Sequence, residues 1–182
     1  MEINAISSRH DFEEAHALIN AMGQWDAEQS RRFGVPDVEL IEFNYGHTVE
    51  TLMEKFSQRG AAFFLARVDK DVAGWVSYSQ SDDSVAELQK MYVRAEARGK
   101  GVAKGLMTAC LDRMRGDGNA SVRLETVTFM TDAIALYEAF GFTRRPPFPS
   151  GSPKLAAHHD FHGEEDLGTE SWANRLPARR TG

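Results

Sequence analysis

The residues best suited to chemistry lie in one short loop, where glycines alternate with basic residues. The loop contains Arg98, Gly99, Lys100 and Gly101, and it joins an apolar run ending at Val93 to a long amphipathic segment. Glycines let a ligand approach the main chain closely. The first N–H groups of a helix have no acceptor within the helix, and the helix dipole attracts negative charge there. The sequence therefore predicts an anion site suited to a phosphate or pyrophosphate.

Two common phosphate-binding patterns do not fit this loop. The Walker pattern G-x-x-x-x-G-K-[ST] is absent from the chain. The dinucleotide pattern G-x-G-x-x-G fails because its sixth position is Lys104, with glycine one place later at Gly105. The strand before the loop is also the third predicted strand, not the first of a β-α-β unit. For the glycines alone, a flexible helix start with a solvated charge cluster is an equally good interpretation.

The surrounding sequence resembles a known family. Residues 98–103 (RGKGVA) are similar to the R/Q-x-x-G-x-G/A signature of the GCN5-related N-acetyltransferase (GNAT) superfamily, and a strand ending M-Y-V precedes them. Residues 124–142 (LETVTFMTDAIALYEAFGF) resemble the family's second region, which ends in L-Y-x-x-x-G-F. The resemblance covers residues 87–142 as sequence and about residues 3–148 as an order of elements. The combination of these features at the family spacing is specific.

This resemblance implies an α/β fold with a mixed, mostly antiparallel sheet flanked by helices. Two central parallel strands, here residues 87–93 and 122–128, would splay apart and hold the pantetheine arm of acetyl-CoA. The main chain at Met91 and Val93 would bind the pantetheine and the acetyl carbonyl, and the amides of residues 99–103 would hold the pyrophosphate. Many members have Asn at the position of Met130, and a subgroup has Met. The cofactor-binding residues expected on this basis are Met91, Tyr92, Val93, Arg98, Gly99, Lys100, Gly101, Val102, Ala103, Met130 and Tyr137.

Two side chains are candidates for proton transfer. Tyr137 matches the family's common general acid, and a phenol of pKa about 10 can protonate a thiolate whose acid has a pKa of about 8.5. Glu87 lies on the same side of its predicted strand as Met91, and its carboxylate could take the proton of an amine, directly or through water. The structural alternatives are a packed aromatic ring and a solvated carboxylate at a strand end. Glu125 and Thr126 are weaker candidates for contacting the amine.

Hydrophobic periodicity predicts the elements that must position these residues. A first helix is capped by Ser7 or Ser8 and stopped by Gly23. The order α, α, β, β, β, α, β, α indicates a mixed sheet with helices on its faces. After the first helix we predict a helix over 48–59, strands over 61–68, 72–79 and 85–93, a helix over 101–114, a strand over 122–128 and a helix over 132–140.

The character of the chain changes after Pro146, where proline, glycine, serine and charged residues dominate. We predict an acetyltransferase domain over residues 1–149, a variable segment over 150–167 and a disordered tail over 168–182. The family usually closes with an apolar strand, but residues 156–167 are polar, so we expect that strand to be short or missing. Adjacent strand residues such as His158 and His159 point to opposite faces, so the histidines there predict no metal site.

Composition narrows the classes of function. A chain of 182 residues with 42% hydrophobic residues builds a core of its own, which excludes disorder of the whole chain. The net charge of −6 lacks the basic footprint of a nucleic-acid binder, although it does not exclude a local cationic pocket. The single cysteine, Cys110, cannot form an intrachain disulfide, and its place on an apolar helix face indicates packing. The absence of an apolar stretch of about 18 residues predicts no transmembrane helix.

The sequence thus predicts a cytoplasmic N-acetyltransferase in which a primary amine attacks acetyl-CoA directly. We expect no metal, no nucleic-acid partner and no membrane, with a homodimer as a family-level expectation. The alternatives are an acyl-CoA-binding sensor without catalysis and a dinucleotide-dependent enzyme that uses Gly99, Gly101 and Gly105. The amine acceptor is not identified by the sequence. Aromatic residues that could line its pocket, or simply pack in the core, are Trp25, Phe33, Phe43 and Tyr45.

Overall fold

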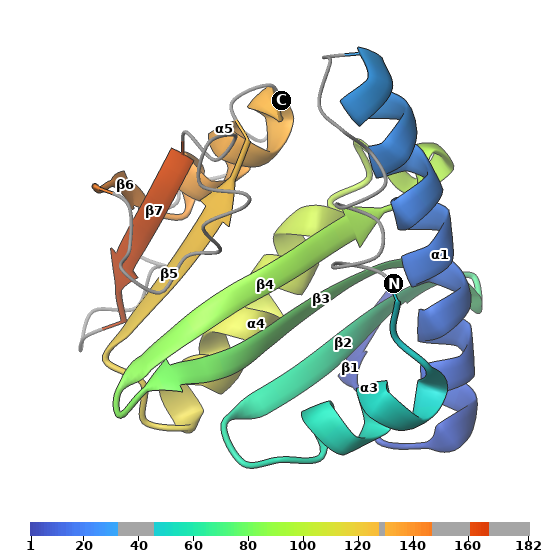
Figure 1. The fold of residues 1–182 in the computed structure, drawn as a ribbon, viewed down its shortest axis with the longest axis horizontal. Coiled ribbons are helices and arrows are strands. Elements are labelled where there is room, and N and C mark those ends of the chain that lie inside the picture. The colour runs from blue at the N-terminus through green and yellow to red at the C-terminus, as the bar shows by residue number, and fades with distance from the viewer. Residues whose placement is uncertain (33–45, 128–129, 147–160, 168–182) are drawn as a thin grey trace, which may run out of the picture. The chain divides into compact units, whose positions relative to one another are not determined.

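The computed structural model describes residues 1–32, 46–127, 130–146 and 161–167. The chain divides into two units, Met1–Ser79 with Lys90–Cys110, and Gln80–Gln89 with Leu111–Gly182. Seven strands form one sheet in the order β1-β2-β3-β4-β5-β7-β6, with β4 and β5 as a parallel pair and antiparallel pairs elsewhere along the sheet (Figure 1). This mixed, mostly antiparallel sheet with flanking helices confirms the predicted fold class.

The helices and strands follow the predicted order closely. The strands expected over 61–68 and 85–93 have these bounds in the structure. In chain order the elements are β1 (Glu2–Ala5), α1 (Arg9–Arg32), α3 (Val49–Phe56), β2 (Ala61–Val68), β3 (Asp71–Asp82), β4 (Val85–Val93), the short 3₁₀ helix η1 (Ala95–Ala97), α4 (Val102–Gly116), β5 (Ser121–Thr126), α5 (Thr131–Ala139), β6 (Thr143–Arg144) and β7 (Phe161–Asp166).

In the first unit, helices cover both faces of the sheet. Trp75 of β3 lies in the core beneath α1 and α3, where its ring stacks on that of Phe63 at 4.9 Å between centroids. The neighbouring Gly74 faces the other way, and a Cβ built there would meet the Leu106 side chain of α4 at 3.3 Å. Because successive strand residues point to opposite faces, this alternation places α4 on the face opposite α1 and α3.

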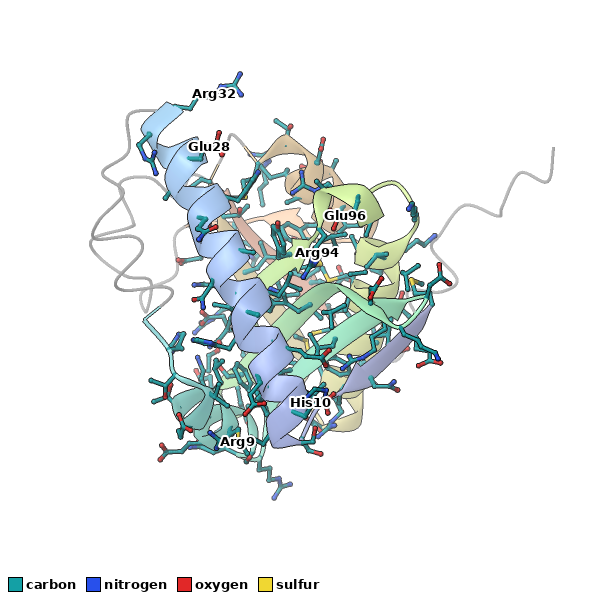
Figure 2. The ribbon with its side chains drawn as sticks, turned by 90° about the vertical axis from the view of Figure 1, so that its right-hand side faces the viewer. Arg9, His10, Glu28, Arg32, Arg94 and Glu96 are labelled. Atoms are coloured by element: carbon teal, nitrogen blue, oxygen red, sulfur yellow. The ribbon has the colours of Figure 1, made fainter. Side chains whose placement is uncertain are left out.

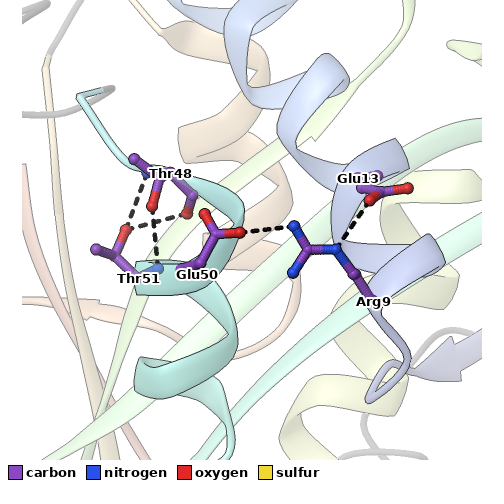
Figure 3. A network of polar contacts seen from close by, with 5 residues as sticks. All are labelled: Arg9, Glu13, Thr48, Glu50 and Thr51. Atoms are coloured by element: carbon purple, nitrogen blue, oxygen red, sulfur yellow. Dashed lines mark hydrogen bonds and ion pairs between the residues drawn. The ribbon is translucent and has the colours of Figure 1, made fainter.

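The start of α3 is specified by a reciprocal cap. The Thr51 N–H donates to the Thr48 hydroxyl oxygen at 3.2 Å, and the Thr48 N–H donates to the Thr51 hydroxyl oxygen at 2.9 Å (Figure 3). One turn of α1 is tied to this cap, because Arg9 pairs with Glu50 at 2.6 Å and with Glu13 at 3.2 Å. These ion pairs are exposed, so they orient the two helix ends and add little stability.

The N-terminal region differs from the prediction at two points. The expected stop at Gly23 is wrong, since α1 continues to Arg32. A helical glycine costs only about 1 kcal/mol relative to alanine, and burial of the next turn at Asp26 and Ala27 offsets that cost. The sequence also did not predict β1. This strand has four residues at the edge of the sheet and only one of them is partly buried, so it carries no alternating pattern.

In the second unit, β5 is paired on both sides. It pairs in parallel with β4 over three residues, from Val85 opposite Ser121 to Glu87 opposite Arg123. It pairs antiparallel with β7 along all six of its residues, so the last strand is present. The buried positions of that strand region alternate as Gly163, Glu165 and Leu167. These inward positions repeat every two residues, as in a strand. The pattern is not visible as hydrophobicity, because two of the three residues are a glycine and a glutamate.

Gly141, which follows α5, is constrained by both its backbone and its surroundings. Its φ is +97°, and a Cβ built there would lie 2.6 Å from a carboxylate oxygen of the buried Glu165. The Gly141→Ala change should therefore lower the free energy of unfolding by about 1–3 kcal/mol. Gly116→Ala is the matched control, because a Cβ at Gly116 meets no atom within 4 Å. Urea unfolding would show this difference, and equal midpoints for the two variants would contradict the explanation.

Candidate functional site

The glycine loop connects β4 to α4 through two left-handed residues. Arg94, directly after β4, donates its N–H to the carbonyl oxygen of Ala73 at 2.9 Å, which anchors the start of the loop. After η1 the chain passes through Gly99 with φ +73° and Gly101 with φ +81°. Non-glycine residues rarely adopt such angles, so the two glycines make the sharp entry into α4 possible.

The loop also leaves main-chain donors available. The first hydrogen bond within α4 is donated by the Gly105 N–H to the Gly101 carbonyl at 3.0 Å. The N–H groups of Val102, Ala103 and Lys104 precede that bond and have no acceptor within the helix. A Cβ built at Gly99 or Gly101 would meet no atom within 4 Å, so the surface of the loop is open. This cradle fits a diphosphate, which takes several N–H donors at a helix start.

Arg98 is held against the end of β4 and does not extend freely from the loop. Its Nε donates to the carbonyl oxygen of Val93 at 3.1 Å, and its guanidinium carbon lies 5.4 Å from the centre of the Trp25 ring. The arginine thus links the loop to the strand and to α1. Trp25, a candidate for the acceptor pocket, contacts this arginine, while Phe33, Phe43 and Tyr45 lie outside the described residues.

A cavity of about 650 Å³ adjoins the loop in the first unit. Its walls are the N-terminal half of α1, the β2–β3 turn and the segment after β4, where Arg94 and Glu96 pair at 3.7 Å (Figure 2). Lys100 of the glycine loop also contributes to the lining. The wall therefore carries both signs of charge, which points to no single class of ligand.

Tyr137 lies in the second unit, on the buried face of α5. Its ring is 5.8 Å from that of Phe142, whose N–H donates to the Tyr137 carbonyl oxygen at 3.1 Å. The Leu-Tyr helix and the Gly-Phe turn are thus one packed unit. Burial raises the pKa of the Tyr137 phenol to about 12, so the group is fully protonated at neutral pH.

Glu87 is engaged in an ion pair. It lies opposite Arg123 on the parallel β4–β5 ladder, and its Oε2 is 3.8 Å from the Arg123 Nε. The glutamate side chain is 42% exposed and that of the arginine only 16%. The carboxylate therefore reaches water while it compensates a mostly buried cation. Glu87 precedes Met91 by four residues, which span about 13 Å in a strand.

Comparison with known proteins identifies the family. The family model described as Acetyltransferase (GNAT) family matches residues 20–142, more than half of the chain. This chain belongs to the GNAT family. The match confirms the resemblance inferred from the glycine loop and the Leu-Tyr region.

Individual relatives support the same assignment. The uncharacterized N-acetyltransferase YjgM of Escherichia coli K12 is 36% identical over 105 residues, which are 53% of this chain and 63% of that protein. The chain thus spans less than two thirds of that relative's length. An IAA acetyltransferase of Azospirillum brasilense is 30% identical over 141 residues, covering 76% of this chain and 88% of the relative.

A solved structure shows the same fold. The crystal structure of PaiA N-acetyltransferase from Thermoplasma acidophilum in complex with coenzyme A has a TM-score of 0.69 and 20% sequence identity. It covers 91% of this chain, and this chain covers 99% of it. At this identity the likeness establishes the fold alone.

Met130, Gly105 and Cys110, which the sequence singled out for different reasons, each have a defined structural position. Met130 is the residue before α5, with its N–H donating to the Val127 carbonyl at 3.1 Å. Gly105 lies inside α4, where a Cβ would meet Ile3 at 2.6 Å, so close packing against β1 explains this glycine. Cys110 is fully buried, and burial raises the pKa of its thiol, as expected of a packing residue.

Two further expectations from the sequence concern a metal site at the C-terminal histidines and a membrane-spanning helix. His158 and His159 lie outside the described residues, and among those that are described no three His, Cys, Asp or Glu side chains gather as metal ligands do. Within the described ranges, no helix has the length and apolar character needed to cross a membrane.

Sequence reasoning missed one group of charged residues in the first unit. Lys90 of β4 is partly buried, and this burial lowers the pKa of its ammonium group to about 7, with a further lowering by Lys55 and an opposing effect from Asp26. His47 is also affected: burial, Lys55, Lys90 and His16 lower its pKa. The available signal was a lysine within the otherwise strand-like run VAELQKMYV.

The raised pKa of Tyr137 makes a prediction about stability in alkali. Below pH 10 the phenol is protonated in both the folded and the unfolded chain, so stability does not depend on it. Between pH 10 and 12 only the unfolded chain releases the proton, so the free energy of unfolding should fall by up to about 1.4 kcal/mol per pH unit. The Tyr137→Phe variant lacks this contribution. Urea midpoints at pH 9, 10 and 11 should diverge between the two proteins, and parallel curves would refute the burial of a neutral phenol.

Proposed function

We propose that this chain transfers the acetyl group of acetyl-CoA to a primary amine by direct attack. The observation that carries the proposal is the pair of left-handed glycines, Gly99 and Gly101, which open the N-terminus of α4 in a chain of the GNAT family. Their open surface and the N–H groups that follow suit the pyrophosphate of coenzyme A. The single cysteine is free and buried, which suits a reducing compartment such as the cytoplasm.

In the proposed reaction, the main chain at the end of β4 positions and polarises the thioester. N–H groups at Met91–Val93 stabilise the oxyanion that forms when the amine nitrogen attacks the acetyl carbon. The C–N bond forms, the C–S bond breaks, and the sulfur leaves with its electron pair. Arg98 keeps this strand end and the glycine loop together through its bond to Val93. The net result is an amide, free coenzyme A and one proton.

Tyr137 supplies a proton to the departing sulfur. With a pKa of about 12, its phenol lies about 3.5 units above a thiol of pKa about 8.5, so full transfer would be uphill by about 5 kcal/mol. The phenol therefore stabilises the developing thiolate by sharing its proton, and the solvent or the protonated amine nitrogen of the tetrahedral intermediate completes the protonation. Glu87 takes the amine proton through water, since its carboxylate is half exposed and paired with Arg123.

The cradle makes a direct prediction for binding. Purified protein should bind coenzyme A, and Gly101→Ala should weaken that binding about tenfold, because alanine at φ +81° forces the loop to rearrange. Gly116→Ala should bind as the unchanged protein does. Isothermal titration calorimetry measures both. Binding of a nicotinamide dinucleotide without binding of coenzyme A would overturn the proposal in favour of the dinucleotide alternative.

The proton-transfer roles predict different kinetic effects for two conservative variants. Tyr137→Phe should lower kcat by about 10²–10⁴-fold with little change in the KM for acetyl-CoA, because only the transition state uses the proton. Glu87→Gln should lower the rate mainly at neutral pH. The rate should recover as the pH rises, because an amine substrate that is already deprotonated needs no general base.

A coenzyme A release assay over an amine panel at controlled pH provides the measurement for these two variants. Full turnover of Tyr137→Phe at all pH values would exclude the general-acid role, and a pH profile of Glu87→Gln that is unchanged in shape would exclude the base role. Coenzyme A binding without thiol release for any amine would favour the acyl-CoA-binding module. Within the polar C-terminal region, Phe161–Asp166 form β7 and pair with β5.

A further inference from the structure

Arg98 is held in the first unit by an aromatic ring and not by a carboxylate. Arg94, four residues earlier, pairs with Glu96 at 3.7 Å. Within the described residues, by contrast, no carboxylate pairs with Arg98. Its guanidinium carbon lies 5.4 Å from the centre of the Trp25 ring, which comes from α1. The face of an aromatic ring attracts a cation without neutralising it, so Arg98 is fixed in place and keeps its full positive charge.

The Arg98 guanidinium lies at the edge of β4 that faces away from β3. The Arg94 N–H, directly after β4, donates to the Ala73 carbonyl oxygen of β3 at 2.9 Å. Successive residues of a strand direct their N–H and C=O groups to opposite edges, so those of Met91 and Val93 point away from β3. At that edge the Arg98 Nε donates to the Val93 carbonyl oxygen at 3.1 Å. The arginine therefore occupies the same strand edge as the main-chain groups proposed to hold the thioester.

Arg98 keeps hydrogen-bond donors for a ligand. A guanidinium carries several N–H donors, and the bond to Val93 uses the one on Nε. Arg98 is an exposed residue, and in the part of the chain that the structure describes no acceptor is bonded to its other donors. The side chain is already ordered at two points, so a ligand that binds it gives up less rotamer freedom than it would with a mobile arginine. Such a preorganised cation directly before Gly99 suits a diphosphate at the helix start.

We propose that Trp25 is a positioning residue for coenzyme A, which acts by holding the Arg98 guanidinium against the end of β4 beside the glycine loop. This inference rests on the proposed function. It assigns Trp25, which the sequence grouped with candidates for the acceptor pocket, to the cofactor side of the reaction. Without the ring, the exposed arginine samples other rotamers, and the loop loses a tie to Val93. The helix α1 thereby contributes to cofactor affinity through a side chain that lies outside the glycine signature.

A double-mutant cycle on coenzyme A binding tests this role by calorimetry. Trp25→Leu should raise the Kd for coenzyme A about three- to tenfold, because it removes the aromatic face and keeps an apolar side chain. Trp25→Phe retains an aromatic face and should stay within about twofold of the unchanged protein. In the Arg98→Met background, Trp25→Leu should have no further effect, because the ring acts through the guanidinium. An equal effect of Trp25→Leu in both backgrounds would overturn the inference.

Two exposed residues of the same unit provide matched controls. Gln24→Ala changes the residue next to Trp25 on α1, and Arg59→Met removes a cation elsewhere. Both variants should bind coenzyme A as the unchanged protein does. Urea unfolding of each variant shows whether it is folded under the conditions of the titration. If Trp25→Phe loses as much affinity as Trp25→Leu, the size of the indole and not its contact with Arg98 is responsible, and the inference fails.

Steady-state kinetics separates this inference from a role in the acceptor pocket and from the proposed function. In the coenzyme A release assay, Trp25→Leu should raise the KM for acetyl-CoA while kcat and the KM for the amine stay within about threefold. A raised KM for the amine with unchanged coenzyme A binding would place Trp25 in the acceptor pocket and overturn the inference.

The two proposals fail in different ways. If no amine releases coenzyme A, acetyl transfer fails, yet a loss of affinity in Trp25→Leu that depends on Arg98 still supports the positioning role. If amines react and the cycle shows no coupling between Trp25 and Arg98, the positioning role fails and acetyl transfer stands. A protein that does not bind coenzyme A at all contradicts both.

Discussion

The positive φ angles at Gly99 and Gly101 are the constraint on which the rest of the proposed site depends. They allow the chain to leave β4, pass η1 and enter α4 within a few residues, with open space beside both glycines. Arg98, between β4 and these turns, bonds back to Val93 and covers Trp25. The loop is therefore an anchored feature at the end of a buried strand, and a flexible helix start would lack these ties.

The ionisable side chains of Tyr137, Glu87 and Lys90 differ in how far the fold removes them from water and in which charges lie near them. Tyr137 is buried without a compensating charge and stays protonated, whereas the Glu87 side chain is 42% exposed and pairs with Arg123. This contrast suits the proposed roles of Tyr137 as acid and Glu87 as base. Lys90 falls between them, since burial and Lys55 oppose the effect of Asp26. The pKa of Lys90, about 7, thus depends on residues of α1, α3 and β4, which meet only in the folded unit.

Much of the fold could be predicted from sequence, because the strands over 61–68 and 85–93 and the amphipathic α4 bury enough apolar surface to carry clear patterns. The failures have physical reasons. Gly23 predicted a helix end, but packing of the following turn overrides a small propensity cost. The strand β7 was obscured because its inward positions include Gly163 and Glu165, and main-chain pairing with β5 stabilises it instead.

The sequence by itself determined a helix start that follows a strand and carries two glycines among basic residues, because short-range backbone preferences decide such a turn. It equally determined the Leu-Tyr helix with its closing Gly-Phe turn. Only the tertiary structure decided which charges meet. Arg123 lies beside Glu87 because β4 and β5, which are far apart in the sequence, pair in parallel. Lys55 and Lys90 act on His47 because α1 and α3 pack on the sheet. Burial and contacts between distant parts of the chain set the pKa values of Lys90 and His47, and neither is encoded in local spacing.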